Sequence, residues 1–197
     1  QEGPAISWQG GGQLREFAQR LQQLDNATLH APAGLHAELR PYQLQGLAWM
    51  QGLAELDIGG LLADDMGLGK TLQTLGHVLC EFNAGRLTQP ALIVMPTSLI
   101  PNWQDEAARF TPQLKVLALH GPKRRALFKL IDQHQIILTT YALLPRDLKA
   151  LSAYRYRLLI LDEAQNIKNP RSKAAIAASQ LQAGQRLCLT GTPLENH

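Results

Sequence analysis

The sequence of residues 60–75, GLLADDMGLGKTLQTL, decides the fold of this chain. Its first four residues form a short apolar run of the kind that makes a buried strand. Gly67 and Gly69 follow, and a stretch with helical character starts at Lys70. A strand that turns into a helix through glycines lets backbone N–H groups approach an anion closely, and the positive end of the helix dipole points at the same place. The stretch therefore predicts a phosphate-binding loop.

The residue types at this turn indicate which atoms would meet a nucleoside triphosphate. Lys70 supplies a positive charge for the β- and γ-phosphates, and the Thr71 hydroxyl can bind Mg²⁺. The match to G-x-x-x-x-G-K-[ST] is imperfect, because Asp64 stands at the first glycine position. We expect ATP to contact Asp65, Met66, Gly67, Leu68, Gly69, Lys70 and Thr71.

A regular alternation of strands and helices begins at Leu39. Strands are expected at 60–63, 91–95, 116–119, 136–139, 158–161 and 186–189, and helices at 41–56, 70–83, 98–110, 123–133 and 171–181. Short apolar runs separated by amphipathic helices indicate an α/β fold, with a mostly parallel sheet covered by helices on both faces. Ligands of such sheets bind at the carboxyl ends of the strands, and each motif described here follows a strand.

A second acidic motif follows the apolar run 158–161. It consists of Asp162 and Glu163, with Gln165 two residues further on. An aspartate at the tip of a buried strand beside a phosphate loop can hold the same Mg²⁺, and the adjacent Glu163 can orient and deprotonate an attacking water. A loop that merely begins with two acids is the simpler alternative. Together with Lys70, the motif predicts nucleotide hydrolysis.

Composition narrows the class of protein. The chain has 197 residues, 45% of them hydrophobic, and a formal net charge of +3, which is compatible with nucleic acid as a partner but does not require it. No apolar run approaches the roughly 18 residues of a membrane helix. Cys80 and Cys188 stand in apolar surroundings, as buried reduced thiols do. The chain starts at Gln1 and stops at His197 after a Gly/Pro turn, so we expect it to be part of a longer protein.

Residues 1–37 differ in character from the rest. A glycine triplet at 10–12 precedes apolar residues at helical spacing, and the segment 31–34, APAG, ends that pattern. We expect a short helical lead-in over 1–37 and one lobe over 38–197.

Four further motifs complete the pattern. LRPYQ at 39–43 precedes the phosphate loop, MPTSLIPNW spans 95–103, TTY spans 139–141, and LTGTPLEN spans 189–196. With the loop and the Asp162 motif, their order and spacing resemble the N-terminal RecA-like motor lobe of the Swi/Snf-type ATPases, a branch of the superfamily-two helicases that translocates on double-stranded DNA. The resemblance covers about residues 35–197 and is strongest to bacterial members.

The resemblance implies a role for each matching residue. Gln43 would recognise adenine, with Arg40 and Tyr42 framing the base. Loops facing the DNA backbone would present Pro96, Ser98, Asn102 and Thr140. Coupling of the nucleotide site to the DNA-facing surface would involve Gln165, Thr190, Gly191 and Thr192. Most eukaryotic members have His where Gln165 stands, and its amide can still bond to the Thr190–Thr192 loop.

Several of these residues have simpler structural alternatives. Trp103 could contact nucleic acid or belong to the core, and Tyr42 could be a packing residue. Thr139 and Thr140 could be ordinary strand residues. The basic run 123–125 is expected to be a solvated helix start.

The resemblance also implies a second RecA-like lobe with arginine fingers, which is absent from these 197 residues. We therefore expect the isolated chain to bind ATP weakly and to hydrolyse little. An RNA-directed helicase of the same superfamily and a non-catalytic nucleotide-gated module remain as alternatives. The protein would be cytoplasmic and nucleoid-associated in a bacterium, nuclear in a eukaryote, and without a membrane partner.

Overall fold

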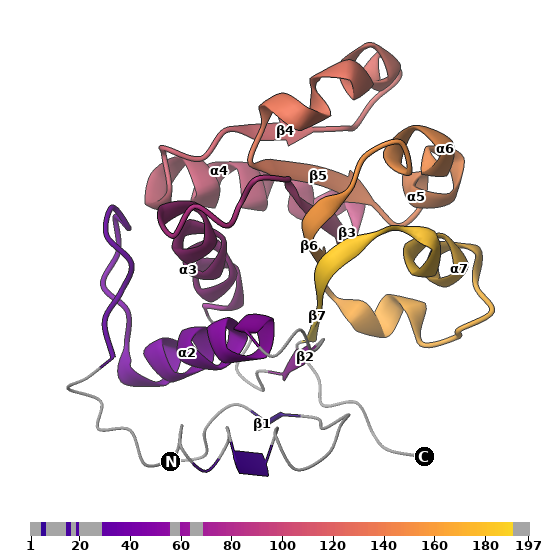
Figure 1. Cartoon of the computed structure of the whole chain (residues 1–197). Coiled ribbons are helices and arrows are strands. Elements are labelled where there is room, and N and C mark those ends of the chain that lie inside the picture. Colours follow the sequence, from indigo (N-terminus) through magenta and orange to yellow (C-terminus); the bar gives the residue numbers. More distant parts are fainter. Residues whose placement is uncertain are drawn as a thin grey trace.

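A parallel sheet forms the centre of the molecule (Figure 1). The computed structural model describes residues 5–6, 15–16, 19, 29–55, 60–63 and 69–190. Within them, seven strands lie in the order β1-β2-β7-β6-β3-β5-β4. The strands are β1 (Ala5–Ile6), β2 (Gly60–Ala63), β3 (Ala91–Met95), β4 (Val116–Ala118), β5 (Ile136–Thr140), β6 (Tyr156–Leu161) and β7 (Ala183–Thr190). β1 pairs antiparallel with β2 and the other pairings are parallel, which confirms the predicted sheet.

Helices cover both faces of this sheet. In Figure 1, α2, α3 and α4 lie on one side and α5, α6 and α7 on the other. Their bounds are α2 (Pro41–Glu55), α3 (Lys70–Asn83), α4 (Ile100–Phe110), α5 (Leu143–Arg146), α6 (Leu148–Leu151) and α7 (Lys173–Gln180). The described residues also include three 3₁₀ helices, η2 (Thr97–Leu99), η3 (Arg124–Gln133) and η4 (Ala164–Ile167). Residues 15, 16 and 19 are also helical.

The sheet separates two apolar clusters, and its interior strand β3 contributes side chains to both. Ala91, Ile93 and Met95 face the cluster that includes side chains of α2, α3 and α4. Leu92 and Val94 face the cluster that includes side chains of η3, α5, α6 and α7. Successive side chains of a strand point to opposite faces, so a strand buried on both faces must be apolar throughout. That is why this run is continuous rather than alternating.

Four local features differ from the sequence-based expectation. The stretch predicted as a helix at 123–133 is the 3₁₀ helix η3, and the helix predicted from 98 starts as η2 before α4. The helices α5 and α6 were not predicted, because four residues are too few to display helical periodicity. Nor was β1, an edge strand inside the predicted helical lead-in. The rest of residues 1–28, apart from 15–16 and 19, lies outside the described residues.

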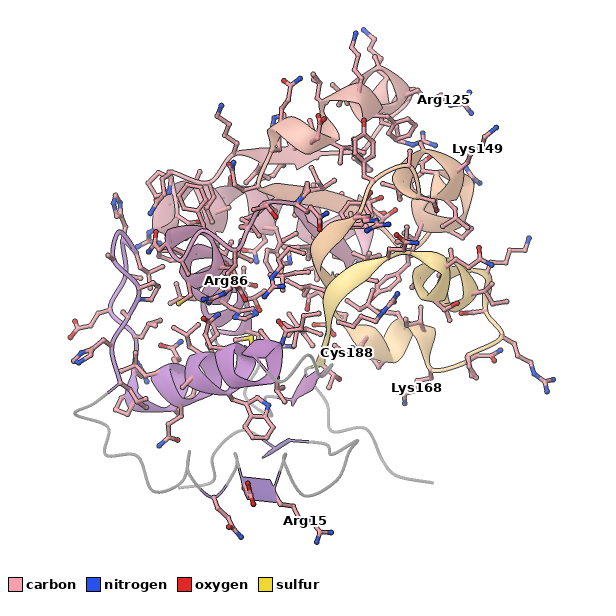
Figure 2. All side chains as sticks on the ribbon, viewed as in Figure 1. Arg15, Arg86, Arg125, Lys149, Lys168 and Cys188 are labelled. Carbon is pink, nitrogen blue, oxygen red and sulfur yellow. The ribbon has the colours of Figure 1, made fainter. Side chains whose placement is uncertain are left out.

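The basic run 123–125 is only partly solvated. Arg125 is exposed and projects outward, as do Lys149 and Lys168 from other segments (Figure 2). Arg124 instead forms a two-pronged ion pair with the buried Asp147, at 2.7 Å from Nε to Oδ2 and 2.9 Å from Nη2 to Oδ1. This pair ties η3 to the start of α6. None of the helices in the described ranges combines the length and apolarity needed to cross a membrane.

A buried polar network joins α2 and α3 to the sheet. His77 is fully buried; its Nδ1 accepts from Gln51 and its Nε2 lies 2.8 Å from Oε1 of Gln185. These partners favour the neutral tautomer protonated at Nε2. Burial lowers the pKa of His77 to about 4. One turn later, the buried Glu81 carboxylate is paired with Arg86 and Arg157.

Candidate nucleotide-binding site

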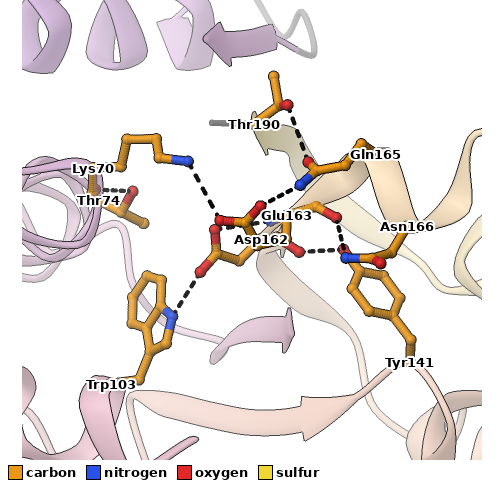
Figure 3. Close-up of polar contacts among 9 residues, drawn as sticks. All are labelled: Lys70, Thr74, Trp103, Tyr141, Asp162, Glu163, Gln165, Asn166 and Thr190. Carbon is orange, nitrogen blue, oxygen red and sulfur yellow. Dashed lines mark hydrogen bonds and ion pairs between the residues drawn. The ribbon is translucent and has the colours of Figure 1, made fainter. Parts of the chain in front are cut away.

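The candidate catalytic side chains meet at the carboxyl edge of the sheet. Lys70 starts α3, which follows β2, and Asp162 and Glu163 directly follow β6. Figure 3 shows the Lys70 ammonium directed at the acidic pair, with Thr190 at the end of β7 nearby. Parallel strands bring their carboxyl ends to one edge, so residues separated by more than ninety positions in the sequence become neighbours.

Lys70 is a buried cation. Its side chain is 7% exposed, and Nζ has no hydrogen-bond partner among the described residues. The nearest opposite charge is Oε1 of Glu163 at 3.9 Å, a distance typical of an ion pair but too long for a hydrogen bond. A buried ammonium whose hydrogen-bonding capacity is unused is suited to receive an anion.

Asp162 is held on both of its carboxylate oxygens. Nε1 of Trp103 donates to Oδ2 at 2.9 Å, and the backbone N–H of Glu163 donates to Oδ1 at 2.9 Å. The Tyr141 hydroxyl donates to the Asp162 carbonyl at 2.6 Å. Burial raises the pKa of this carboxyl, and the Trp103 bond and the Lys70 charge oppose that rise. Each oxygen keeps a lone pair, so the carboxylate is oriented while still able to bind a cation.

Glu163 has an unusual backbone conformation. Its φ of 51° is the only positive φ of a non-glycine residue in the described ranges. Left-handed backbone disfavours residues with a Cβ and persists where neighbouring contacts hold it. Here the Gln165 amide donates to Oε2 of Glu163, and the Asn166 amide donates to the Glu163 carbonyl at 2.9 Å. The Thr190 hydroxyl donates to Oε1 of Gln165 at 3.0 Å, so one amide links Glu163 to the end of β7 (Figure 3).

Gln43 lies against Gly69, the residue before α3. It is buried, and its Oε1 accepts from the backbone N–H of Arg40 at 2.9 Å. Its Nε2 lies so close to Gly69 that a Cβ there would approach it to 2.1 Å. Gly69 itself has φ +88°, which favours glycine. Arg40 is exposed and Tyr42 is half-buried. All three residues predicted to meet adenine lie at the start of α2.

A further carboxylate, Glu106 on α4, lies close to this site. The Thr71 hydroxyl donates a hydrogen bond to it, and Asp162 is near enough to act on its pKa. Burial raises the pKa of Glu106, while the Thr71 bond lowers it. Oε2 of Glu106 is buried and has no hydrogen-bond partner among the described residues.

The residues predicted to face DNA divide into two groups. Ser98 and Asn102 are exposed and Pro96 is half-buried, around the start of α4. Thr140 is buried, and its hydroxyl accepts from the backbone N–H of Leu143 at 3.2 Å. The Thr140 side chain therefore supports the turn after β5, and a DNA contact there stays a prediction.

Some predicted site residues lie outside the described residues, namely Asp65, Met66, Gly67, Leu68, Gly191 and Thr192. Conversely, the contacts of Glu106 and Tyr141 with this site were not foreseen. Trp103 is 1% exposed, so the core alternative is correct, and its indole also contacts Asp162. The spacing of Trp103 and Glu106, three residues apart, was a signal that both lie on one face of a helix.

Comparisons with known proteins identify the family of this chain. Residues 42–197 match the family described as the SNF2-related domain. This chain belongs to the SNF2-related family. The SNF2-related chain is 38% identical over 188 residues to the putative ATP-dependent helicase/translocase YwqA of Bacillus subtilis, covering 93% of the chain and 20% of that protein. It is 39% identical over 184 residues to the chromatin-remodeling ATPase INO80 of Cryptococcus neoformans, covering 87% and 10% respectively.

A solved structure shares the fold. The Sulfolobus solfataricus SWI2/SNF2 ATPase core in complex with dsDNA matches with a TM-score of 0.79 and 41% identity, over 86% of this chain and 35% of that chain. This confirms the predicted RecA-like fold class. The SNF2-related chain spans about a fifth or less of the length of these two relatives and about a third of the archaeal core. Both bacterial and eukaryotic proteins are among its relatives.

Proposed function

We propose that residues 38–197 form the ATP-binding lobe of an ATP-driven motor that moves along double-stranded DNA. The observation that carries the proposal is the buried Lys70 ammonium, which has no hydrogen-bond partner among the described residues and faces Asp162 and Glu163. A buried cation opposite two carboxylates at the carboxyl edge of a parallel sheet fits a triphosphate and its metal. The names of the relatives, ATP-dependent helicases and remodelling ATPases, support the same reaction.

Mg²⁺ fits the residues present. Asp162 keeps free lone pairs on an oriented carboxylate, and Thr71 adds a hydroxyl oxygen. Mg²⁺ is usually held by one or two protein oxygens together with phosphates, so Asp162 and Thr71 would be sufficient protein ligands. When bound, Mg²⁺ would neutralise charge on the phosphates. Asp162 and Thr71 are the residues that would hold it.

The chain's own residues would carry the remaining steps. Lys70 would exchange Glu163 for the β- and γ-phosphates of ATP. Glu163, thereby released, would orient the attacking water and accept its proton. Gln43 would bind the adenine edge through its amide beside Gly69, with Arg40 and Tyr42 framing the base.

The second half of the catalytic site would come from a second RecA-like lobe of the same protein. Arginine fingers accelerate phosphoryl transfer by about 10³–10⁵ in GTPases, so a single lobe is expected to hydrolyse ATP slowly. Gln165 would connect ATP chemistry to the segment of Thr190, Gly191 and Thr192.

Double-stranded DNA is the proposed track. The archaeal relative was solved in complex with dsDNA. Ser98 and Asn102 are exposed beside the half-buried Pro96, and hydroxyl and amide groups contact phosphates without selecting a base sequence. Binding should therefore weaken steeply with salt. The protein would act where the DNA is, in the nucleoid of a bacterium or the nucleus of a eukaryote.

The test is Glu163→Gln in the protein that joins this lobe to its second lobe. We expect ATP binding to be retained and dsDNA-stimulated hydrolysis to fall by about 10²-fold or more, because the general base is lost. Asp132→Asn, an exposed carboxylate on η3, is the control and should leave the rate unchanged. An unchanged rate in Glu163→Gln would overturn the role of Glu163. Stimulation by RNA in place of dsDNA would favour an RNA-directed helicase.

A further inference from the structure

The helix α4 carries two side chains that reach the proposed metal site. Trp103 and Glu106 are three residues apart, so they project from the same face of the helix. Each contacts one of the two residues, Asp162 and Thr71, that we propose to hold Mg²⁺. We propose that Trp103 and Glu106 are positioning residues for Mg²⁺, which they fix indirectly through Asp162 and Thr71. This inference rests on the proposed function.

Trp103 determines the orientation of the Asp162 carboxylate. Its indole N–H is a donor only, so the bond to Oδ2 has one polarity and cannot be reversed. The ring is 1% exposed and packed in the apolar cluster beside α3, which leaves it little freedom to rotate. With the Glu163 N–H on Oδ1, the carboxylate is held at both oxygens.

Glu106 determines the orientation of the Thr71 hydroxyl. A threonine hydroxyl has one proton and two lone pairs. When the proton is donated to Glu106, the lone pairs point elsewhere and are available to a cation. Oε2 of Glu106 is buried and has no hydrogen-bond partner among the described residues.

Both contacts are of the kind made by outer-shell partners of metal sites. Such partners orient the ligands, and replacing one typically lowers metal affinity by about 10–100-fold. The nucleotide itself touches neither residue in this proposal. The signature of the two positioning residues is therefore a change in the requirement for Mg²⁺ and not in metal-free nucleotide binding.

The experiment measures binding of a fluorescent ADP analogue to the 197-residue chain, first in EDTA and then in a titration with MgCl₂. Glu106→Gln keeps the side-chain shape but replaces one carboxylate oxygen by an NH₂ group and removes the charge, so the remaining amide oxygen would hold the Thr71 hydroxyl more weakly. Asp105→Asn makes the same change at an exposed position of the same helix. For Glu106→Gln we expect the Mg²⁺ concentration that gives half of the maximal increase in ADP-analogue binding to rise by about tenfold or more. The affinity for the analogue in EDTA should be unchanged. Asp105→Asn should match the wild type.

Trp103→Phe tests the second residue, because it keeps an aromatic ring and removes the N–H. We expect the same rise in the Mg²⁺ requirement. Direct binding of Mn²⁺ in the presence of ADP, measured as the loss of the EPR signal of the free ion, should weaken in parallel. Thermal unfolding of each variant shows whether the substitution causes a folding defect. A variant that also lost nucleotide affinity in EDTA would show that its residue has a structural role, and this result would overturn the inference.

Two further outcomes separate this inference from the proposed function. One outcome is that Mg²⁺ strengthens analogue binding by the wild-type chain and by both variants, Glu106→Gln and Trp103→Phe, at the same concentration. In that case only the positioning inference is wrong. If the wild-type chain binds the analogue with no response to Mg²⁺, the metal site of the proposed function is wrong and the inference fails with it.

Discussion

Replacing Gly69 by alanine tests the proposed contact between the phosphate loop and the adenine-binding residue. Two destabilising effects of the substitution should add, one from the backbone conformation and one from the contact with Gln43. The left-handed φ of +88° disfavours a residue with a Cβ by about 1–2 kcal/mol. The new Cβ would also lie 2.1 Å from Nε2 of Gln43, which must move and loses its bond from the Arg40 N–H, worth about 1 kcal/mol.

Gly85 supplies a matched control. Its φ is +74°, and a Cβ there would meet nothing within 4 Å. Gly69→Ala and Gly85→Ala should therefore share the backbone effect, a fall in Tm of about 2–8 °C for a domain of this size. Only Gly69→Ala should also displace Gln43.

Nucleotide affinity is the decisive measurement. Loss of the adenine hydrogen bond, about 1.4 kcal/mol, corresponds to about tenfold weaker ATP binding. Binding of GTP should weaken less, because Gln43 is proposed to recognise adenine. Titration with fluorescent ATP and GTP analogues measures both affinities. If Gly69→Ala kept the wild-type affinity and the wild-type ATP preference, or if Gly85→Ala lost as much, the proposed role of Gln43 would be refuted.

Three further predictions concern other contacts. Because burial lowers the pKa of His77 to about 4, the neutral imidazole stabilises the fold fully above pH 6.5, and this stability is lost as the pH falls toward 4. His77→Gln should make the free energy of unfolding, measured in urea, less dependent on pH in this range, by up to about 1.4 kcal/mol per pH unit. Asp147→Asn breaks the two-pronged bond from Arg124 and should lower the free energy of unfolding by about 1.5–3 kcal/mol, while nucleotide titrations stay unchanged. Gln165→Ala removes the link between Glu163 and Thr190 and should lower dsDNA-stimulated hydrolysis in the two-lobed protein by about tenfold, with ATP affinity retained.

Each of these predictions has a matched control at an exposed position. His120→Gln should keep the wild-type pH dependence, Arg125→Ala the wild-type stability and Gln182→Ala the wild-type hydrolysis. An unchanged pH slope in His77→Gln would mean that other groups cause acid unfolding. Equal stability of Asp147→Asn and the wild type would mean that the ion pair contributes nothing net. Weakened ATP binding in Gln165→Ala would contradict a purely coupling role.

The strands, and the helix that begins at Lys70, could be predicted from the sequence because their signals are local. Residues 91–95 are apolar throughout, as a strand buried on both faces must be, and the predicted bounds equal those of β3. The glycines before Lys70 mark a strand-to-helix turn in the same way. Apolar spacing could not separate a 3₁₀ helix from an α-helix at 123–133, because spacings of three and four residues both give one apolar face.

The supporting contacts of the site could not be predicted, because they depend on tertiary structure. Nothing near Trp103 in the sequence indicates that its indole N–H meets a carboxylate 59 positions away. The Gln165 amide that contacts Glu163 is likewise held by Thr190, 25 positions further on, which becomes its neighbour only because β6 pairs with β7. The sequence identifies the reacting groups, and the fold determines how they are held.

The ion pair between Lys70 and Glu163 has a consequence for selectivity among anions. The site contains its own competitor, since any incoming anion must take the ammonium from a carboxylate already 3.9 Å away. A lone sulfate or inorganic phosphate has one charged group for that exchange. A nucleoside triphosphate bound as proposed would also be held at its base and along its phosphate chain, so it would displace the carboxylate with several contacts at once. If ATP binds as proposed, the Glu163 carboxylate would therefore favour long polyphosphates over the abundant small anions of a cell.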